Sequence, residues 1–296
     1  MAHLGVVGTA VQSSSEDEVT LTLDQAVPVD ATILLAIAWD SPSPGGVPAI
    51  TGVADTGGNS WSTTPDVSAH ADATVAVAIL RTRVTTELDQ GDTITVTIDD
   101  ARGRWCMQAD AFDDIVASPL DETTSSDGSS SALSTGTTGT TSTPHQLLYA
   151  AFGFGGGRDV TVPEGWTGAD KLETSAGSGN RALQVTHRYV AATGAYEATL
   201  TLSTSSTYAA AMGTYEIVSP DPEARLSQLR IQAPNPGEAK LARLSQLALV
   251  APQAKIGEAR LSQLRIEAPA GEGQPYTGLK IARDGAWWNA GVHVLD

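Results

Sequence analysis

Apolar and polar residues alternate in short runs along the first 218 residues of the chain. In Thr93–Ile98 the apolar residues Ile94, Val96 and Ile98 fall on every second position. This period of two is typical of β-strands that bury one face. Comparable runs, separated by Gly, Pro, Asn and Asp, occur at Gly5–Gln12, Glu18–Leu23, Ala31–Trp39, Ala49–Val53, Ala73–Val84, Asp92–Ile98 and Arg104–Ile115. The pattern predicts an all-β sandwich or barrel of short strands.

The order of landmarks in this region is repeated in its second half. Trp61 and Trp166 each follow a turn rich in Gly or Asn and lie 105 residues apart. The other matched pairs are Ala31–Trp39 with His145–Phe152, Thr93–Ile98 with Glu197–Leu202 at an offset of 104, and Trp105…Phe112 with Tyr208…Tyr215 at an offset of 103. Offsets this similar indicate an internal duplication.

The two halves are joined by Ser118–Thr143, which is almost entirely Ser, Thr and Gly. Such a segment is either a long crossing loop or a polar edge strand within one sandwich, or a flexible linker between separate domains. We predict that residues 1–218 form one internally duplicated, two-sheet, jelly-roll-like sandwich. A pair of tandem small domains is the alternative.

A repeated phrase dominates residues 223–270. The copies are Ala224-Arg-Leu-Ser-Gln-Leu229, Ala242-Arg-Leu-Ser-Gln-Leu247 and Ala259-Arg-Leu-Ser-Gln-Leu264, spaced by 18 and 17 residues, and each runs through alternating apolar positions to an Ala-Pro. Pro cannot donate to a β-ladder, so the phrase is typical of a short strand. A short helix, an extended tether and a low-complexity linker are the other interpretations.

A unit of 17 or 18 residues with three or four apolar side chains cannot offset the entropy of its own ordering. Three copies are few for a solenoid, so we expect their partners to be other chains. Ser219–Pro222 forms a linker before this arm, and residues 271–296 follow it. In that tail Asp284-Gly285 is a preferred hairpin turn and predicts strands at Leu279–Arg283 and Ala286–Leu295.

An isolated hairpin with two adjacent tryptophans needs a surface to cover. We therefore predict that the arm and the hairpin form an assembly interface. Its residues are Leu226, Leu229, Ile231, Leu244, Leu247, Leu249, Leu261, Leu264, Ile266, Trp287 and Trp288.

Charge is distributed unevenly. Residues 1–222 carry 8 Lys/Arg against 27 Asp/Glu, whereas residues 223–272 carry 7 against 5. A strongly acidic domain repels phosphate backbones, so nucleic-acid binding is not expected. No apolar run reaches membrane-spanning length, and Met1–Leu4 shows no signal-peptide pattern, so we expect synthesis in the cytoplasm and no membrane insertion.

Catalytic patterns are weak. The five histidines have no metal-site spacing, the carboxylate doublets Asp99-Asp100 and Asp113-Asp114 point to opposite faces of a strand, and Asp89–Asp92 departs from calcium-ligand spacing. Cys106 lies in a dense apolar stretch, which predicts a buried thiol. We therefore expect no enzyme activity and no cofactor or metal.

Trp61 and Trp166 have two interpretations. Matched tryptophans in duplicated halves would fill matched core positions. If they instead project from loops, their faces could stack on sugar rings, which would make them ligand-binding residues of a carbohydrate-binding module.

The arm phrase Ala-Arg-Leu-Ser-Gln-Leu-x-[Ile/Leu]-x-Ala-Pro resembles the repeats of minor tail proteins of long-tailed phages that infect actinobacteria. The ending Leu279-Lys-Ile…Asp284-Gly-Ala-Trp287 is similar to endings of virion proteins from the same phages. The sandwich, with Ile50–Trp61, Gly91–Val96 and Ala117–Asp121, is similar to concanavalin-like or jelly-roll modules in such proteins. These motifs are architectural, and the phrase here has Arg and Ala-Pro where the family has Val and Val-Pro.

The resemblance implies a non-enzymatic structural protein located in the virion. It implies a homo-oligomer, with a trimer favoured, that contacts other virion proteins. A carbohydrate-binding module that recognises a host cell-surface glycan and a capsid-surface decoration protein are the alternatives.

Overall fold

The structure is a computed structural model that describes residues 3–40, 49–71, 74–175, 180–218, 263–266, 279–283 and 286–290. These residues form strands and connecting turns, without a helix, so the predicted all-β class is confirmed. The chain divides into two compact units, Met1–Ile231 and Gln232–Asp296.

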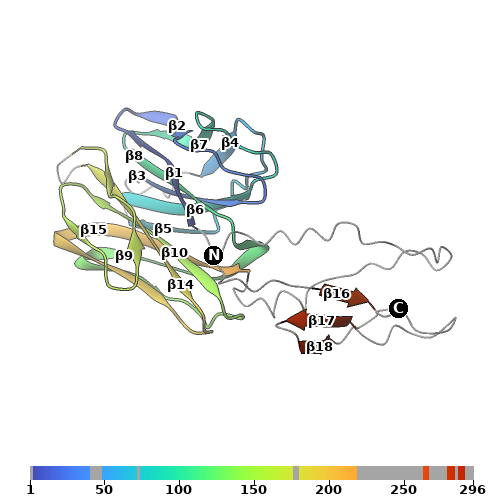
Figure 1. Cartoon of the computed structure of the whole chain (residues 1–296). Coiled ribbons are helices and arrows are strands. Elements are labelled where there is room, and N and C mark those ends of the chain that lie inside the picture. Colours follow the sequence, from blue (N-terminus) through green and yellow to red (C-terminus); the bar gives the residue numbers. More distant parts are fainter. Residues whose placement is uncertain are drawn as a thin grey trace. The chain divides into compact units, whose positions relative to one another are not determined.

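One curled antiparallel sheet contains the first eight strands (Figure 1). They are β1 (His3–Gln12), β2 (Glu16–Leu23), β3 (Thr32–Asp40), β4 (Ile50–Asp55), β5 (Val67–Ala71), β6 (Val75–Arg83), β7 (Thr93–Arg102) and β8 (Trp105–Phe112), in the order β4-β7-β2-β1-β8-β3-β6-β5. The sheet folds over where β1 and β2 pair through only two residue pairs. Strands β2, β7 and β4 thereby share a core with β1, β8, β3 and β6.

Sequence pattern and burial agree within this sheet. Strand β2 alternates exposed and buried positions, with Val19, Leu21 and Leu23 inside, because its other face meets solvent. Strands β3 and β8 are apolar almost throughout and are buried on both faces. A strand covered on both sides is apolar at nearly every position, and its few polar residues, such as Gln108 and Asp110 in β8, are hydrogen-bonded.

The second sheet repeats this arrangement. It consists of β9 (Ile115–Thr137), β10 (Gln146–Gly155), β11 (Val160–Thr161), β12 (Thr167–Gly168), β13 (Leu172–Glu173), β14 (Arg181–Val190) and β15 (Glu197–Ile217). The 21-residue β15 pairs with β11 at its start and with β10 at its end. The single strand β15 is therefore equivalent to β7 and β8 of the first sheet together. In the same way, the 23-residue β9 is equivalent to β1 and β2 together. The three matched strand segments of the sequence fall on these equivalent strands, and Trp61 and Trp166 lie in loops before β5 and β12, in agreement with a duplication.

The segment predicted as a crossing loop, a polar edge strand or a linker is largely strand β9. Its Ser and Thr residues pair with β15 from Ile115 to Thr137, with register shifts where the ladder bends. Pairing satisfies the backbone groups, so a polar strand needs few apolar side chains. The short strand β5 was not predicted.

Two sheets, each contributed by one half of the chain, pack against each other as the predicted sandwich. A middle core lies between β3, β6 and β8 of the first half and β10, β14 and β15 of the second. Each half also closes around a core of its own, the first core and the second core. The halves are therefore joined by a middle core to which both contribute.

In the second unit, β16 (Gln263–Ile266), β17 (Leu279–Arg283) and β18 (Ala286–Ala290) form a three-stranded antiparallel sheet, here called the C-terminal sheet. The β17–β18 pair lies where the Asp-Gly hairpin was predicted, and β16 is part of the third copy of the repeat phrase. The first two copies lie outside the described residues.

Candidate functional site

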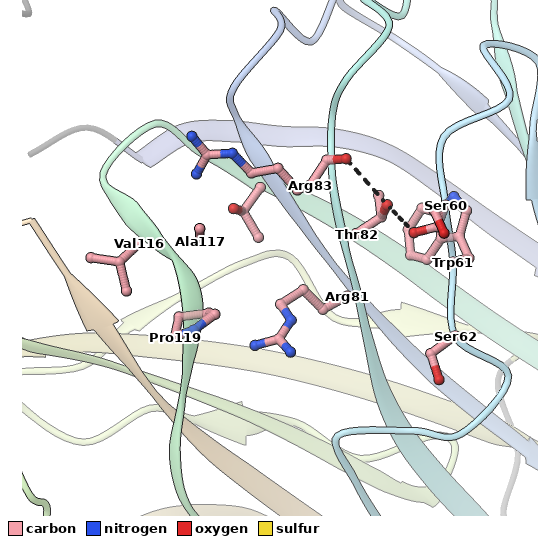
Figure 2. A pocket seen from close by; sticks show the side chains of 10 residues that line it. Ser60, Trp61, Ser62, Arg81, Thr82, Arg83, Val116, Ala117 and Pro119 are labelled. Atoms are coloured by element: carbon pink, nitrogen blue, oxygen red, sulfur yellow. Dashed lines mark hydrogen bonds between the residues drawn. The ribbon is translucent and has the colours of Figure 1, made fainter. Parts of the chain in front are cut away.

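A cavity of about 290 Å³ lies beside the loop that carries Trp61, and it is called the Trp61 cavity here. Figure 2 shows its walls: the β4–β5 loop on one side, β6 in the middle and the beginning of β9 opposite. The lining residues are Thr32, Ser60, Trp61, Ser62, Arg81, Thr82, Arg83, Val116, Ala117 and Pro119. Because β9 belongs to the second half, this cavity forms only when the two halves are packed together.

The loop before Trp61 is held rigidly by Asp55 and Asn59. Asn59 is 6 % exposed, and its Oδ1 accepts hydrogen bonds from the backbone N–H groups of Thr85 and Thr86, both at 2.8 Å. Asp55 Oδ1 accepts the Asn59 N–H at 3.0 Å, and Asp55 Oδ2 accepts the indole N–H of Trp61 at 2.7 Å. A Gly in the left-handed region, at φ 72° for Gly58, closes the turn. Trp61 is therefore preorganised.

Arg81 and Arg83 occupy alternate positions of β6 and both reach the cavity (Figure 2). Arg81 Nη2 lies 3.5 Å from Asp66 Oδ1, and its guanidinium carbon lies 5.9 Å from the centre of the Tyr215 ring. Burial raises the pKa of Asp66, although the charge of Arg81 acts against that rise. Thr82, between the two arginines, donates to the Ser60 carbonyl at 2.8 Å and ties β6 to the loop.

Arg83 is held at the seam between the halves. Its Nη1 donates to the Ile115 carbonyl at 2.9 Å, and its Nη2 lies 3.3 Å from Asp30 Oδ1. No Asp or Glu side chain is among the residues that line the cavity. The cavity thus combines two cations, hydroxyls and an aromatic ring, which suits binding of a polar anionic ligand and offers no nucleophile paired with a base.

The two predicted ligand-binding tryptophans differ. Both are partly buried and pack against the core of their own half, so each contributes to a core as the first interpretation expected. Trp61 additionally lines the Trp61 cavity, whereas Trp166 is not among the residues that line it. Sequence reasoning missed Arg81 and Arg83, although two alternate arginines in an otherwise apolar run were a signal.

A second polar cluster, buried in the middle core, links the halves. Asp110 is 1 % exposed; its Oδ1 lies 3.0 Å from His3 Nε2, and its Oδ2 accepts from Gln108 Nε2 at 2.8 Å and from the Tyr149 hydroxyl at 2.7 Å. The ring of His187 lies 4.4 Å from that of His3. Burial of His187 lowers its pKa to about 4, and the charge of the neighbouring His3 adds to that shift. These groups are covered by both sheets, so we assign them a structural role.

Asp114 offers a pH-dependent test of this region. It is 4 % exposed, and burial, with a further contribution from Asp113, raises its pKa from 3.8 to about 6. The folded chain then holds the proton more tightly than the unfolded chain, so ionisation of Asp114 removes stability as the pH rises from 3.8 to about 6. We expect Asp114→Asn to be more stable than the wild type at pH 8 by about 1–3 kcal/mol, with no such advantage below pH 3.8.

Urea unfolding at both pH values measures this difference. His187 acts in the opposite direction, since its lowered pKa removes stability as the pH falls from 6.5 to about 4. It does so in both proteins, and the comparison between them therefore isolates Asp114. The exposed Asp17→Asn is the control, and an Asp114→Asn protein no more stable than the wild type at pH 8 would contradict the assignment.

Cys106 is fully buried, as expected, and burial raises the pKa of its thiol to about 12, which suppresses thiolate chemistry. Among the residues that the structure describes, no three His, Cys, Asp or Glu side chains gather to hold a metal ion. The same part of the chain contains no helix of the length and apolarity that a membrane span requires.

Of the predicted assembly residues, four lie in the C-terminal sheet: Leu264, Ile266, Trp287 and Trp288. The register places Leu264 opposite Ile281, which is opposite Trp288, so one row across the sheet is apolar. Ile266, Leu279 and Ala290 form the next such row. The other predicted residues, Leu226, Leu229, Ile231, Leu244, Leu247, Leu249 and Leu261, lie outside the described residues.

The geometry thus provides a polar cavity in the sandwich and a small sheet built from a repeat copy. Comparisons of this chain with protein-family models, with curated proteins and with solved structures find no match, so its function has to be inferred from this geometry.

Proposed function

We propose that the protein is a non-enzymatic structural component of a phage particle, a minor tail protein or tail appendage. In this proposal it assembles through its repeat arm and C-terminal hairpin and displays the acidic sandwich. A homo-oligomer, with a trimer favoured, is its working form, and other virion proteins are its further partners. The resemblance of the repeat phrase and of the chain ending to phage tail proteins supports the location.

One observation carries the assembly role: a copy of the repeat phrase is a strand at the edge of the hairpin. Strand β16 pairs with β17 over four residue pairs, from Gln263↔Ala282 to Ile266↔Leu279. The phrase is therefore able to add to a sheet edge through its backbone. The sequence has three copies of the phrase, so the first two copies remain for sheet edges of other chains.

The size of the C-terminal sheet supports the same role. Its strands are four or five residues long, and two of its cross-strand rows consist of apolar residues. A three-stranded sheet needs a hydrophobic face packed against something to be stable. Equivalent sheets of sister chains would supply that surface symmetrically.

Replacing the central leucine in every copy tests assembly. We expect the full-length wild type to sediment as an oligomer and the triple variant Leu229→Asp, Leu247→Asp, Leu264→Asp to sediment as a monomer, because charges at these apolar positions prevent packing. The matched control is Gln228→Asp, Gln246→Asp, Gln263→Asp, which adds the same charge at the neighbouring positions and should stay oligomeric. A monomeric wild type, or equal behaviour of the two variants, would overturn the proposal.

Location in the particle has a separate test. An antibody against the sandwich, applied to purified phage particles and viewed by electron microscopy, should label the tail. Labelling spread over the capsid would favour a capsid-surface decoration protein instead. Absence from the particle would refute the virion role.

Recognition of a host cell-surface glycan is a second candidate role. It is favoured by the Trp61 cavity, which is lined by an aromatic ring, hydroxyls and two arginines. This role and assembly are compatible, because the cavity lies in the first unit and the repeat copy lies in the second.

A further inference from the structure

Two arginines line the Trp61 cavity, although the region of the chain around it is strongly acidic. Residues 1–222 carry 27 Asp/Glu and only 8 Lys/Arg, yet two of the eight cations line this one cavity without an acid among its walls. A concentration of cations in an acidic surface produces a local attraction for anions. Two of the few arginines in this acidic region thus line one shared cavity.

Neither arginine is fully occupied by its carboxylate. The Arg81 side chain is 26 % exposed and its ion pair is 3.5 Å long. The Arg83 side chain is 35 % exposed, and its partner Asp30 is 83 % exposed, so that pair is worth little in water. Both guanidinium groups can consequently donate hydrogen bonds to an incoming anion. The two parallel N–H groups of a guanidinium fit the paired oxygens of a carboxylate or phosphate.

Trp61 favours a ligand that has an apolar surface as well as a negative charge. Its indole N–H already donates to Asp55, so the ring presents carbon to its other neighbours. Its position is fixed by the Asn59 network, which reduces the entropy that binding would cost. An aromatic side chain beside the hydroxyl of Ser60 suits a pyranose, which has a face of C–H groups and a rim of hydroxyls. The Ser62 hydroxyl also lines the cavity but is hydrogen-bonded to the backbone of Thr64.

We propose that the Trp61 cavity binds one acidic sugar unit, a uronate or a sugar phosphate, of a larger glycan. The volume of about 290 Å³ is at the low end for ligand sites, which fits one monosaccharide. In this arrangement Arg81 and Arg83 bind the anionic group, and Trp61 packs on the ring. This inference rests on the glycan-recognition role and is independent of the proposed assembly.

Isothermal titration of the full-length protein with four probes tests the ligand class. Glucuronate and glucose 6-phosphate should bind with dissociation constants on the order of 1 mM, the range of single sugar units with few contacts. Glucose and inorganic phosphate should each bind at least about tenfold more weakly, because each lacks one of the two features recognised. Glucose binding as tight as glucuronate would overturn the acidic class, and phosphate binding as tight as glucose 6-phosphate would show an anion site only.

Matched variants then place the site. Arg83→Gln should weaken glucuronate at least about tenfold, whereas Arg188→Gln, an exposed arginine of β14, should leave binding unchanged. Trp61→Ala should weaken it similarly and Trp166→Ala should not, with thermal melting to establish that each variant is folded. Wild-type affinity in Arg83→Gln, or no binding of any probe to the folded wild type, would refute the inference, and sedimentation as an oligomer would leave the assembly role standing.

Discussion

Replacement of Asp110 by Ala is expected to lower the free energy of unfolding by about 3–5 kcal/mol, among the largest effects of any single substitution in the chain. Asp110 accepts hydrogen bonds from Gln108 and Tyr149 and pairs with His3, all within or beside the middle core. Without the carboxylate these donors remain buried and unpaired. The loss is large because Tyr149 belongs to the second half, so the bond joins two sheets.

Urea unfolding at pH 7, followed by circular dichroism, measures this effect. Asp110→Asn keeps the shape and part of the hydrogen bonding, and it should fall between the wild type and Asp110→Ala. Asp17→Ala, at an exposed position of β2, should change the stability by less than about 0.5 kcal/mol. A loss below about 1 kcal/mol for Asp110→Ala would show that the cluster does not hold the halves together.

Trp105→Ala is expected to destabilise the fold by about 3–5 kcal/mol, and to do so in both halves together. Trp105 is completely buried in the first core and stacks on Trp39 at a centroid distance of 6.1 Å. Its removal leaves a cavity that the folded-over first sheet cannot close. The effect should reach the second half because strands β3, β6 and β8 border both the first core and the middle core.

Hydrogen exchange separates the two parts of this prediction. Amides of β10 and β14 in the second half should lose protection to the same extent as those of β3 and β8. Val11→Ala, at a position that is 44 % exposed, serves as the control and should be nearly neutral. Unchanged protection in β10 would mean that the halves unfold separately and that the middle core couples them weakly.

The strands of the first half could be predicted because their side-chain pattern reports on their surroundings. In β7, Ile94, Val96 and Ile98 alternate with polar residues, and the strand indeed has one buried face. The duplication could also be predicted, since Trp61 and Trp166 precede equivalent strands. Strand β9 could not be assigned uniquely, because Ser and Thr residues form strands, loops and linkers equally well until a partner strand is known.

In the candidate site, too, some residues could be predicted from the sequence and others could not. Trp61 was a candidate from the sequence alone, because a turn rich in Gly and Asn precedes a tryptophan. Arg81 and Arg83 were not, since nothing local to β6 indicates that Pro119, near the beginning of β9, will face them. Similarly, Asp110 and Tyr149 are 39 residues apart, and only the packing of two sheets brings them together.

The sequence by itself determined that this chain is all-β, that its sandwich is duplicated, and that its C-terminal phrases have the pattern of strands. These properties depend on local alternation, turn residues and repetition, which are all visible along one dimension. Only the tertiary structure decided that each half curls around its own core, that a shared middle core with a buried Asp110 joins them, and that a cationic cavity opens at their seam. Those features depend on contacts between residues far apart in the chain, and no local pattern encodes which faces will meet.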